Sequence, residues 1–133
     1  MLTYGDGISD VNLNNLLKFH KNHKRIATMT IVRPAGRFGE IEINSKSEIN
    51  YFKEKPKLTK GWINGGFFVF NSEIFDYISD RNEMLEIDAL NKLSANNELV
   101  GYKHEGFWQC IDTPRDLEIA ENYMRDLNEH SSI

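Results

Sequence analysis

Two aspartates, Asp6 and Asp112, each stand just after a stretch of residues that has the composition of a β-strand. Asp6 lies between Gly5 and Gly7, and Asp112 follows Ile111. Ligands of open α/β sheets bind beyond the carboxyl ends of the strands. A carboxylate with small neighbours suits a magnesium ion, which keeps substrate phosphates in its coordination shell. Each aspartate is therefore a candidate metal ligand, and the two together make a stronger case than either one alone.

Both aspartates also have a structural interpretation. Gly5-Asp6-Gly7 is a turn sequence, since glycine and aspartate both favour turns. Asp112 precedes Thr113 and Pro114, and an aspartate at such a junction commonly caps the following helix. If Thr113 is the cap instead, Asp112 is free to bind a ligand.

A second charged group, Glu54 and Lys55, precedes Pro56 at the expected end of a strand. A lysine held there can place its ammonium as a point charge on a phosphate, while Glu54 can accept hydrogen bonds from sugar hydroxyls. The structural alternative is a charged strand exit, because surface charge pairs are often no more than solvated side chains. The local sequence alone favours this surface interpretation.

The segment from Gly61 to Gly66 combines an amide side chain, Asn64, with two consecutive glycines inside an apolar stretch. Paired glycines weaken a strand, and they often mark a place where a ligand approaches the backbone. Asn64 and Gly65 can therefore recognise hydroxyl groups in a shallow pocket, with Trp62 or Trp108 as a wall. Alternatively, the tryptophans belong to the core and the glycines relieve crowding.

Other reactive residue types show no catalytic pattern. The four histidines lack metal-ligand spacing, and we expect the first two, His20 and His23, on a helix surface. Cys110 lies in an expected strand, which favours an unreactive buried thiol. The loop from Arg33 to Arg37 can contact a phosphate, but a solvated loop is the preferred interpretation. The sequence contains no Ser-His-Asp pattern and no Walker loop.

Hydrophobic periodicity and turn residues predict a mixture of strands and helices around these candidates. We expect Ser9 or Asp10 to cap the first helix and Thr113 to cap the last one. One hairpin among β-α units favours an α/β fold with a mixed central sheet and a small antiparallel hairpin over an all-parallel sheet. The expected strands are 2–5, 26–32, 38–43, 49–54, 62–70, 99–103 and 107–111, and the expected helices end near 23, span 72–78 and 84–94, and begin at 113.

Bulk composition bounds the class of protein. The chain has 133 residues, which fits one domain, and its net charge of -4 argues against a nucleic-acid-binding protein. No apolar run reaches the roughly 18 residues of a membrane span. A single cysteine excludes an intrachain disulfide and favours a reducing compartment, so we expect a cytoplasmic protein without nucleic-acid or membrane partners. Because a buried strand begins at Leu2 with no lead-in, we also expect the chain to belong to something longer.

Five longer motifs follow one another along nearly the whole chain: LTYGDGISDV from Leu2, PAGRFG from Pro34, FKEKP from Phe52, GWINGGFFV from Gly61 and GFWQCIDTPRD from Gly106. In this order they resemble the glucose-1-phosphate cytidylyltransferases, a branch of the sugar-1-phosphate nucleotidyltransferase family. The Glu-Lys-Pro and aspartate motifs are shared across sugar nucleotidyltransferases. The GWINGGFF and GFWQ strings are more specific to the cytidylyl branch.

The resemblance implies a Rossmann-like nucleotidyltransferase fold, here incomplete, in which residues 1–133 are the C-terminal sugar-phosphate- and metal-binding part. Asp6 and Asp112 match the family's two metal aspartates, so the resemblance implies that they share one Mg²⁺. Lys55 matches the lysine that contacts the phosphate of glucose 1-phosphate. The sugar pocket would be lined by Glu54, Asn64 and Gly65.

The implied reaction transfers CMP from CTP to glucose 1-phosphate and gives CDP-glucose and pyrophosphate. The sugar phosphate attacks the α-phosphorus directly, so positioning and charge neutralisation supply most of the catalysis. Lys55, Asp6 and Asp112 are the implied catalytic residues, and no protein nucleophile is needed.

One family feature has no counterpart in this sequence, namely the N-terminal glycine-rich loop that holds the nucleotide triphosphate. Cys110-Ile111 also replaces the family's Pro-Met. We therefore expect the isolated chain to lack turnover, and to self-associate or to be unstable unless a missing N-terminal half completes it, because its first strand would be an exposed sheet edge. Two alternatives remain. One is a non-catalytic nucleotidyltransferase-like module that binds sugar phosphate or a partner subunit, and the other is a metal-dependent glycosyltransferase, in which Glu-Lys-Pro would have no role.

Overall fold

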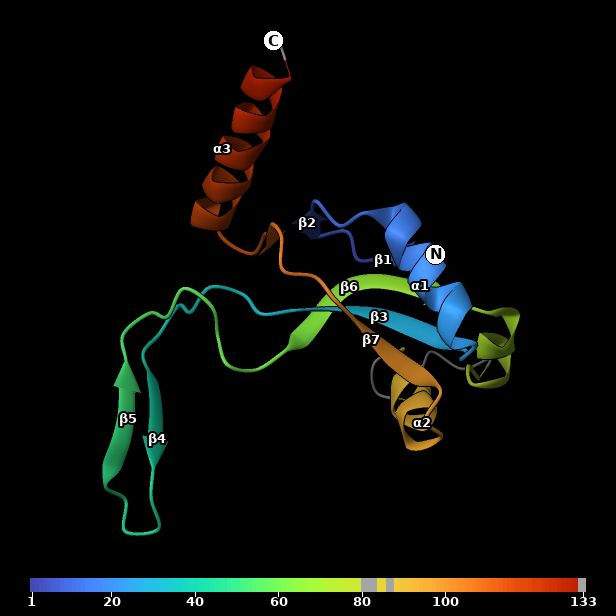
Figure 1. Ribbon diagram of the computed structural model, residues 1–133, viewed down its shortest axis with the longest axis horizontal. Coiled ribbons are helices and arrows are strands. Elements are labelled where there is room, and N and C mark those ends of the chain that lie inside the picture. The colour runs from blue at the N-terminus through green and yellow to red at the C-terminus, as the bar shows by residue number, and fades with distance from the viewer. Residues whose placement is uncertain (80–83, 86–87, 132–133) are drawn as a thin grey trace.

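The computed structural model describes residues 1–79, 84–85 and 88–131. These residues form an α/β arrangement with a central sheet, two additional two-stranded sheets and flanking helices (Figure 1). In chain order the elements are β1 (Leu2–Thr3), β2 (Gly7–Ser9), α1 (Leu13–His23), β3 (Ala27–Val32), β4 (Glu40–Ile43), β5 (Ile49–Lys53), β6 (Ile63–Phe70), the 3₁₀ helix η1 (Ser72–Asp76), α2 (Ala89–Ala95), β7 (Leu99–Lys103), β8 (Trp108–Cys110) and α3 (Pro114–His130).

The central sheet has the strand order β1-β6-β3-β7. β3 pairs antiparallel with β6 and parallel with β7, so the sheet is mixed, as the sequence predicted. β3 lies between two neighbours and buries Ala27, Thr28, Thr30 and Val32. β1 lies at the edge, and its Leu2 is 41% exposed. The expectation of a buried first strand was therefore wrong, because an edge strand is covered on one side only.

Helices α1 and α2 lie on opposite faces of this sheet, as Figure 1 also shows. Successive residues of a strand point to opposite faces. Ala27 of β3 packs in the core with Leu90 of α2, whereas the next residue, Thr28, lies 2.8 Å from a ring nitrogen of His20 in α1. The main core cluster consists of Ala27, Phe68, Ile74, Ala89, Leu90 and Leu93.

Helix α1 begins slightly later than the sequence suggested. Its N-cap is Asn12, whose side chain accepts a hydrogen bond of 2.9 Å from an amide in the first turn. Ser9 does not cap the helix because it pairs with Trp108 in the β2–β8 sheet. His20 is only 4% exposed, so the expected surface position was wrong for this residue. It lies on the helix face that packs against β3, where Thr28 provides a polar partner.

The remaining strands agree with the predicted ranges to within two residues, except that β2 was not predicted. The segment Ser72–Asp76 is a 3₁₀ helix, which ends two residues before the end of the predicted range 72–78. Helix α2 begins at Ala89, whereas the predicted helix began at residue 84. Residues 86–87 of the predicted range 84–94 lie outside the described residues. The last helix has the predicted cap, Thr113, followed by a proline in its first turn.

Strands β4 and β5 form a separate antiparallel hairpin that projects away from the central sheet (Figure 1). On one face the Lys60 ammonium pairs with Glu42 and lies 3.6 Å from the centre of the Tyr51 ring. The other face contributes nothing to the main core. Its apolar side chains are more than half exposed: Ile41 (53%), Ile43 (62%), Ile49 (61%) and Phe52 (61%).

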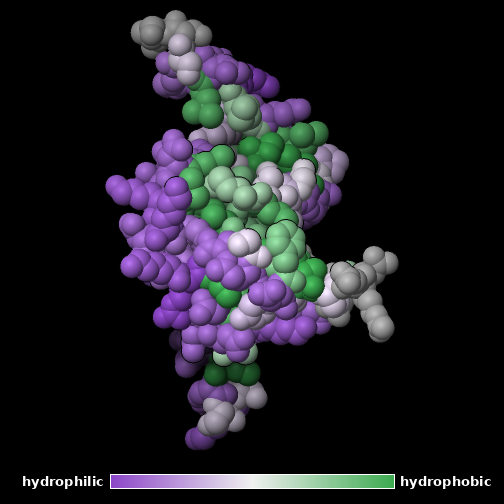
Figure 2. Space-filling view, turned by 90° about the vertical axis from the view of Figure 1, so that its right-hand side faces the viewer, coloured by the Kyte–Doolittle hydropathy of each residue, from purple (hydrophilic) through white to green (hydrophobic). Residues whose placement is uncertain are grey.

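Exposed apolar surface is not confined to the hairpin. Figure 2 shows a band of hydrophobic residues across the middle of one face of the molecule, bordered by hydrophilic residues. At the first strand, Met1 is 63% exposed and the nearby Leu13 of α1 is 49% exposed. None of the helices within the described ranges has both the length and the hydropathy needed to cross a membrane.

Candidate functional site

The pairing of β2 with β8 brings the two candidate metal ligands together. β2 begins just after Asp6, β8 ends shortly before Asp112, and Gly7 lies opposite Cys110 in the antiparallel ladder. The amide of Ile111 extends this ladder by donating a hydrogen bond of 2.8 Å to the carbonyl of Asp6. Residues from opposite ends of the chain therefore meet at one corner of the fold.

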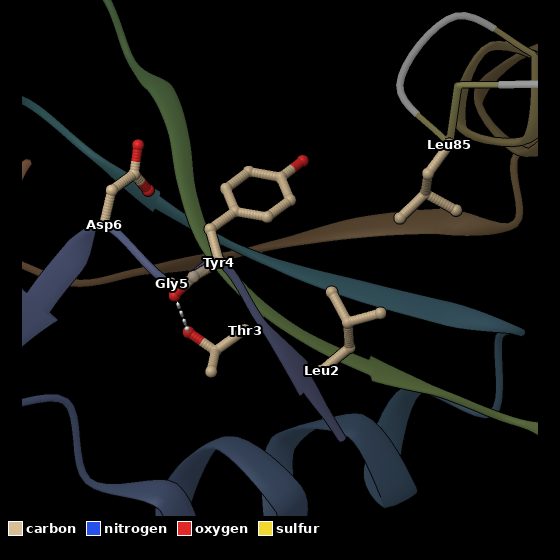
Figure 3. Close-up of a pocket in the computed structure, with 6 residues that line it drawn as sticks. All are labelled: Leu2, Thr3, Tyr4, Gly5, Asp6 and Leu85. Atoms are coloured by element: carbon tan, nitrogen blue, oxygen red, sulfur yellow. Dashed lines mark hydrogen bonds between the residues drawn. The ribbon is translucent and has the colours of Figure 1, made fainter.

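Asp6, Cys110 and Asp112, here called the aspartate corner, each offer a ligand atom, and these atoms lie within 4.8 Å of one another. The Cys110 Sγ lies 3.7 Å from Asp6 Oδ2 and 3.5 Å from Asp112 Oδ2. Figure 3 shows Asp6 just beyond the end of β1, with its carboxylate turned away from Leu2 and Leu85. Both aspartates are exposed, so the space around their carboxylates is open to solvent and ligands.

The thiol between the two aspartates is protonated. Burial raises the pKa of Cys110 to about 11, helped by hydrogen bonding to Asp112 and by the negative charge of Asp6. The thiol therefore keeps its hydrogen near neutral pH, which makes it a poor nucleophile, and this single hydrogen donates weakly to one carboxylate at a time. The sequence predicted an unreactive thiol but not its place in this corner. Strand alternation was the available signal, because residues 110 and 112 fall on the same face of an extended segment.

The donor set of the aspartate corner fits a magnesium ion. Mg²⁺ takes oxygen ligands at about 2.0–2.1 Å in an octahedral arrangement and is usually bound by one or two carboxylates plus substrate phosphates. Carboxylate oxygens within 4.8 Å of one another need only small side-chain rotations to reach one such ion. Sulfur is a soft ligand, whereas this hard cation prefers oxygen donors. Asp6 and Asp112 are therefore the candidate ligands, and Cys110 is not.

A cavity of about 130 Å³ lies beside Asp6. Asn64 stands in its wall, where its amide nitrogen donates to the Tyr4 hydroxyl (3.2 Å) and its oxygen accepts from the Gly66 amide (2.8 Å). Gly65 lines the same cavity. Two predicted pocket residues, Asn64 and Gly65, thus lie next to a predicted metal ligand. The lining also includes Trp108 and Cys110.

The two glycines have a structural reason as well as a place in the pocket. A Cβ atom at Gly65 would lie 2.9 Å from the carbonyl oxygen of Thr30, and Gly66 has a φ of +78°, with the Tyr4 ring close to the missing side chain. The Gly65 carbonyl accepts a hydrogen bond of 2.9 Å from the indole of Trp108. Trp108 therefore forms a wall of this cavity. The same two glycines relieve crowding against Thr30 and Tyr4 and also line the pocket, so both interpretations apply to them.

The other tryptophan, Trp62, lines a separate cavity of about 240 Å³. The Arg33 guanidinium stacks over its ring at 4.7 Å, and Arg33 also forms a 3.2 Å ion pair with Glu105. At the other end of the same loop, Arg37 pairs with the buried Asp116 at 2.8 Å. Both arginines of this loop therefore have partners, while Arg37 stays 55% exposed to solvent.

Glu54 and Lys55 lie outside both cavities, at the exit from β5. Both are exposed, and Lys55 has no ion-pair partner within the part of the chain that the structure describes. The backbone of Lys55 has a φ of +38°, which non-glycine residues seldom adopt. The next residue, Pro56, is buried, and its carbonyl accepts a hydrogen bond of 2.9 Å from the amide of Gly36. The fold thus fixes the backbone beside Lys55 while leaving its ammonium available to an anion.

Asp116 is a buried acid that the sequence interpretation did not single out. It is 4% exposed and forms a capping box with Thr113 at the start of α3. Hydrogen bonding from Thr113 holds the pKa of Asp116 below its ordinary value, and the charge of Arg37 acts in the same direction. The spacing of three residues from the predicted cap is the signal that would have identified it.

The chain belongs to the nucleotidyl transferase family, whose model matches residues 1–126. It is 41% identical over 121 residues to the glucose-1-phosphate cytidylyltransferase of Salmonella typhimurium. This match covers 91% of this chain and 47% of that protein. It is 32% identical over 115 residues to mannose-1-phosphate guanylyltransferase 1 of Arabidopsis thaliana. That match covers 84% of this chain and 32% of the Arabidopsis thaliana protein. A crystal structure from Bacillus anthracis, assigned to the glucose-1-phosphate thymidylyltransferases and containing sucrose, matches with a TM-score of 0.62 at 24% identity, over 92% of this chain and 52% of that chain.

These comparisons confirm the resemblance to the cytidylyltransferases and the α/β nucleotidyltransferase fold. The chain spans about half the length of the curated cytidylyltransferase it matches, 47% in the Salmonella typhimurium protein. The names of the similar proteins differ in both the base and the sugar.

Proposed function

We propose that this chain is the sugar-phosphate- and metal-binding part of a nucleotidyltransferase that transfers CMP from CTP to glucose 1-phosphate, giving CDP-glucose and pyrophosphate. The observation that carries the proposal is the aspartate corner. Asp6 and Asp112, from opposite ends of the chain, offer oxygen ligands within 4.8 Å beside a cavity lined by Asn64 and Gly65. Transfer between phosphates requires positioning and neutralisation of charge, which such an arrangement supplies.

The choice of substrates rests on the relatives and on where the branch-specific motifs lie. Identity is 41% to the cytidylyltransferase of Salmonella typhimurium and 32% to the guanylyltransferase of Arabidopsis thaliana. The two motifs more specific to the cytidylyl branch supply Asn64, Gly65 and Trp108, and all three residues line the cavity beside Asp6. These observations favour glucose 1-phosphate as the acceptor and CTP as the donor.

In the proposed reaction, a phosphate oxygen of glucose 1-phosphate attacks the α-phosphorus of CTP. A bond forms between these two atoms, the bond from the α-phosphorus to the bridging oxygen breaks, and pyrophosphate leaves with the electron pair. The attacking phosphate is already an anion, so no general base is required. A bound Mg²⁺ supplies Lewis-acid neutralisation of the phosphate charges.

Each predicted site residue has a role in this scheme. Asp6 and Asp112 hold the cation position at the corner. Lys55, whose ammonium has no ion-pair partner within the described ranges, neutralises the phosphate of the acceptor. The sugar hydroxyls are oriented by Glu54, Asn64 and the backbone of Gly65.

The proposal is tested by measuring pyrophosphate release from CTP and glucose 1-phosphate by the full-length protein. We expect Asp6→Asn and Asp112→Asn each to lower kcat by a factor on the order of 100 or more, which is typical for the loss of a group that stabilises transition-state charge. Asp126→Asn, an exposed aspartate of α3, is the matched control and should retain full activity.

Two results would change this assignment. Full turnover by either corner variant would remove the metal assignment. Binding of glucose 1-phosphate without turnover in the presence of any nucleoside triphosphate would favour a non-catalytic binding module instead.

A further inference from the structure

We propose that Asp116 is a positioning residue that fixes the backbone of the metal ligand Asp112, with Arg37 and Gln109 completing the unit. This inference rests on the proposed function and deepens it. Asp116 contributes no ligand atom to the aspartate corner, which consists of Asp6, Cys110 and Asp112. It acts through the peptide group of Asp112.

Both carboxylate oxygens of Asp116 are fully engaged. Oδ2 accepts hydrogen bonds from the amide of Asp112 (3.2 Å), the amide of Thr113 (3.0 Å) and the hydroxyl of Thr113 (2.9 Å). Oδ1 accepts from Arg37 Nη2 (2.8 Å) and Gln109 Nε2 (3.0 Å). All of these donors converge on a residue that is 4% exposed.

This arrangement exceeds what a helix cap needs. A capping box requires only the reciprocal bonds between Thr113 and Asp116. The additional bonds reach Asp112 before the helix, Gln109 in β8 and Arg37 in the loop between β3 and β4. Asp116 therefore ties the stretch from β8 to the helix cap and the β3–β4 loop to the start of α3.

The backbone leading into Asp112 is fixed on both sides. On one side the Ile111 amide donates to the carbonyl of Asp6 at 2.8 Å, and on the other the Asp112 amide donates to Asp116 at 3.2 Å. The carboxylate of Asp112 itself stays exposed, with the Cys110 thiol as a weak donor. Because the backbone of Asp112 is fixed, its carboxylate stays near Asp6, although Asp116 does not contact that carboxylate.

Arg37 extends this unit toward the predicted acceptor site. It lies close to Gly39, where an added Cβ would be 3.2 Å from Glu54 Oε2. The loop between β3 and β4 thus hydrogen-bonds to Asp116 through Arg37 and passes close to Glu54 at Gly39. Partners of this kind, which hydrogen-bond around the ligands, typically contribute about 10–100-fold to metal affinity.

Asp116→Asn disrupts this unit without changing its shape. A side-chain amide has one acceptor oxygen and one donor nitrogen. Whichever way it turns, either the Asp112 and Thr113 donors or the Arg37 and Gln109 donors face another N–H group. We therefore expect Mn²⁺, used as a paramagnetic probe for Mg²⁺, to bind at least about tenfold more weakly to this variant.

The experiment titrates the full-length protein with Mn²⁺ and follows the free ion by electron paramagnetic resonance, so that no turnover is needed. Asn12→Ala is the matched control, because it removes the cap of α1 without touching the aspartate corner. Wild type and Asn12→Ala should bind Mn²⁺ equally, Asp116→Asn more weakly, and Asp112→Asn weakest. Arg37→Ala, at an exposed side chain, should give a smaller loss and decides the question if Asp116→Asn does not fold.

The outcomes separate this inference from the proposed function. Unchanged Mn²⁺ affinity in Asp116→Asn, or in Arg37→Ala where the former does not fold, overturns the positioning role and leaves the metal site standing. Absence of Mn²⁺ binding by wild type, or wild-type affinity in Asp112→Asn, removes the metal site and the inference together.

Discussion

The aspartate corner and the β4–β5 hairpin carry the two halves of the proposed site, and the fold supports them differently. The corner is tied by the β2–β8 ladder and by the buried Asp116. The hairpin is a separate two-stranded sheet whose apolar side chains are more than half exposed. At its exit, Lys55 has no ion-pair partner among the residues that the structure describes.

This difference matches the demands of the two roles. A metal site requires its ligands to be held to within about half an ångström, so its support has to be rigid. A lysine ammonium is a point charge on a long flexible stem and tolerates looser support. We therefore expect changes in the central sheet and the corner to alter folding or metal binding, and changes in the hairpin to alter acceptor binding alone.

The largest effect should come from a matched pair of phenylalanines. Phe68→Ala should lower the free energy of unfolding by about 3–5 kcal/mol, because Phe68 is 1% exposed in the main core. Phe52→Ala in the hairpin should change it by no more than about 0.5 kcal/mol, since Phe52 is 61% exposed. Equilibrium urea denaturation measures both. Equal losses would mean that the apolar face of the hairpin is covered in solution, and the contrast between the regions would fail.

A second pair of variants tests the close approach at the pocket wall. Gly65→Ala should cost about 1–3 kcal/mol of unfolding free energy, because the added Cβ meets the carbonyl oxygen of Thr30 at 2.9 Å. Gly61→Ala is the control, since a Cβ there meets nothing within 4 Å. Chemical denaturation of both variants checks the difference. A neutral Gly65→Ala would show that β6 can move away from β3 and that the pocket wall is not rigid.

Lys55→Ala tests the hairpin side of the proposed site. It should weaken glucose 1-phosphate binding about tenfold, which is typical of losing a charged hydrogen bond, while leaving Mn²⁺ binding and stability unchanged. Calorimetry with magnesium and glucose 1-phosphate measures the affinity. Lys53→Ala, an exposed lysine at the end of β5, is the control and should bind normally. Equal affinities of wild type and Lys55→Ala would rule out the proposed phosphate contact.

The smallest effect is a pH dependence at the C-terminal end of α1, where His23 is half-buried. Burial lowers the pKa of His23, the charge of His20 lowers it further, and Glu98 opposes this. The Arg25 amide donates to His23 Nδ1 at 2.9 Å, so the fold accommodates the neutral ring. Because the folded pKa lies below the unfolded value of 6.5, this stabilisation is complete above pH 6.5 and is lost as the pH falls toward the folded pKa.

Urea denaturation just above and well below pH 6.5 measures this loss, and His23→Gln should reduce the difference. A variant with the full pH dependence of wild type would assign the effect to other groups. Because the β4–β5 hairpin carries no histidine, substitutions there should leave the profile unchanged.

Local patterns in the sequence were sufficient for much of the fold. Alternating and β-branched segments predicted β3 to β7 to within two residues, and the Thr113-Pro114 pair predicted the start of α3. These elements depend on neighbouring residues, so their signals lie within a short window. The two aspartates were likewise found because each follows a strand.

Contacts between separate segments could not be predicted from local patterns in the sequence. β2 has only three residues and exists because it pairs with β8, about a hundred positions away. The burial of His20 depends on Thr28 across the α1–β3 interface, and the importance of Asp116 depends on Arg37. The last two cases are polar residues whose partners no local pattern identifies.

The central claim is that Asp6 and Asp112 bind one divalent cation in common. The most direct measurement is anomalous diffraction from crystals of the full-length protein grown with Mn²⁺. We predict one strong anomalous peak at the aspartate corner, with an oxygen of each carboxylate at coordination distance, about 2.1 Å for an Mg²⁺-like ion. A peak bound by only one of the two residues, or a corner without a peak while Mn²⁺ is bound elsewhere, would contradict the claim.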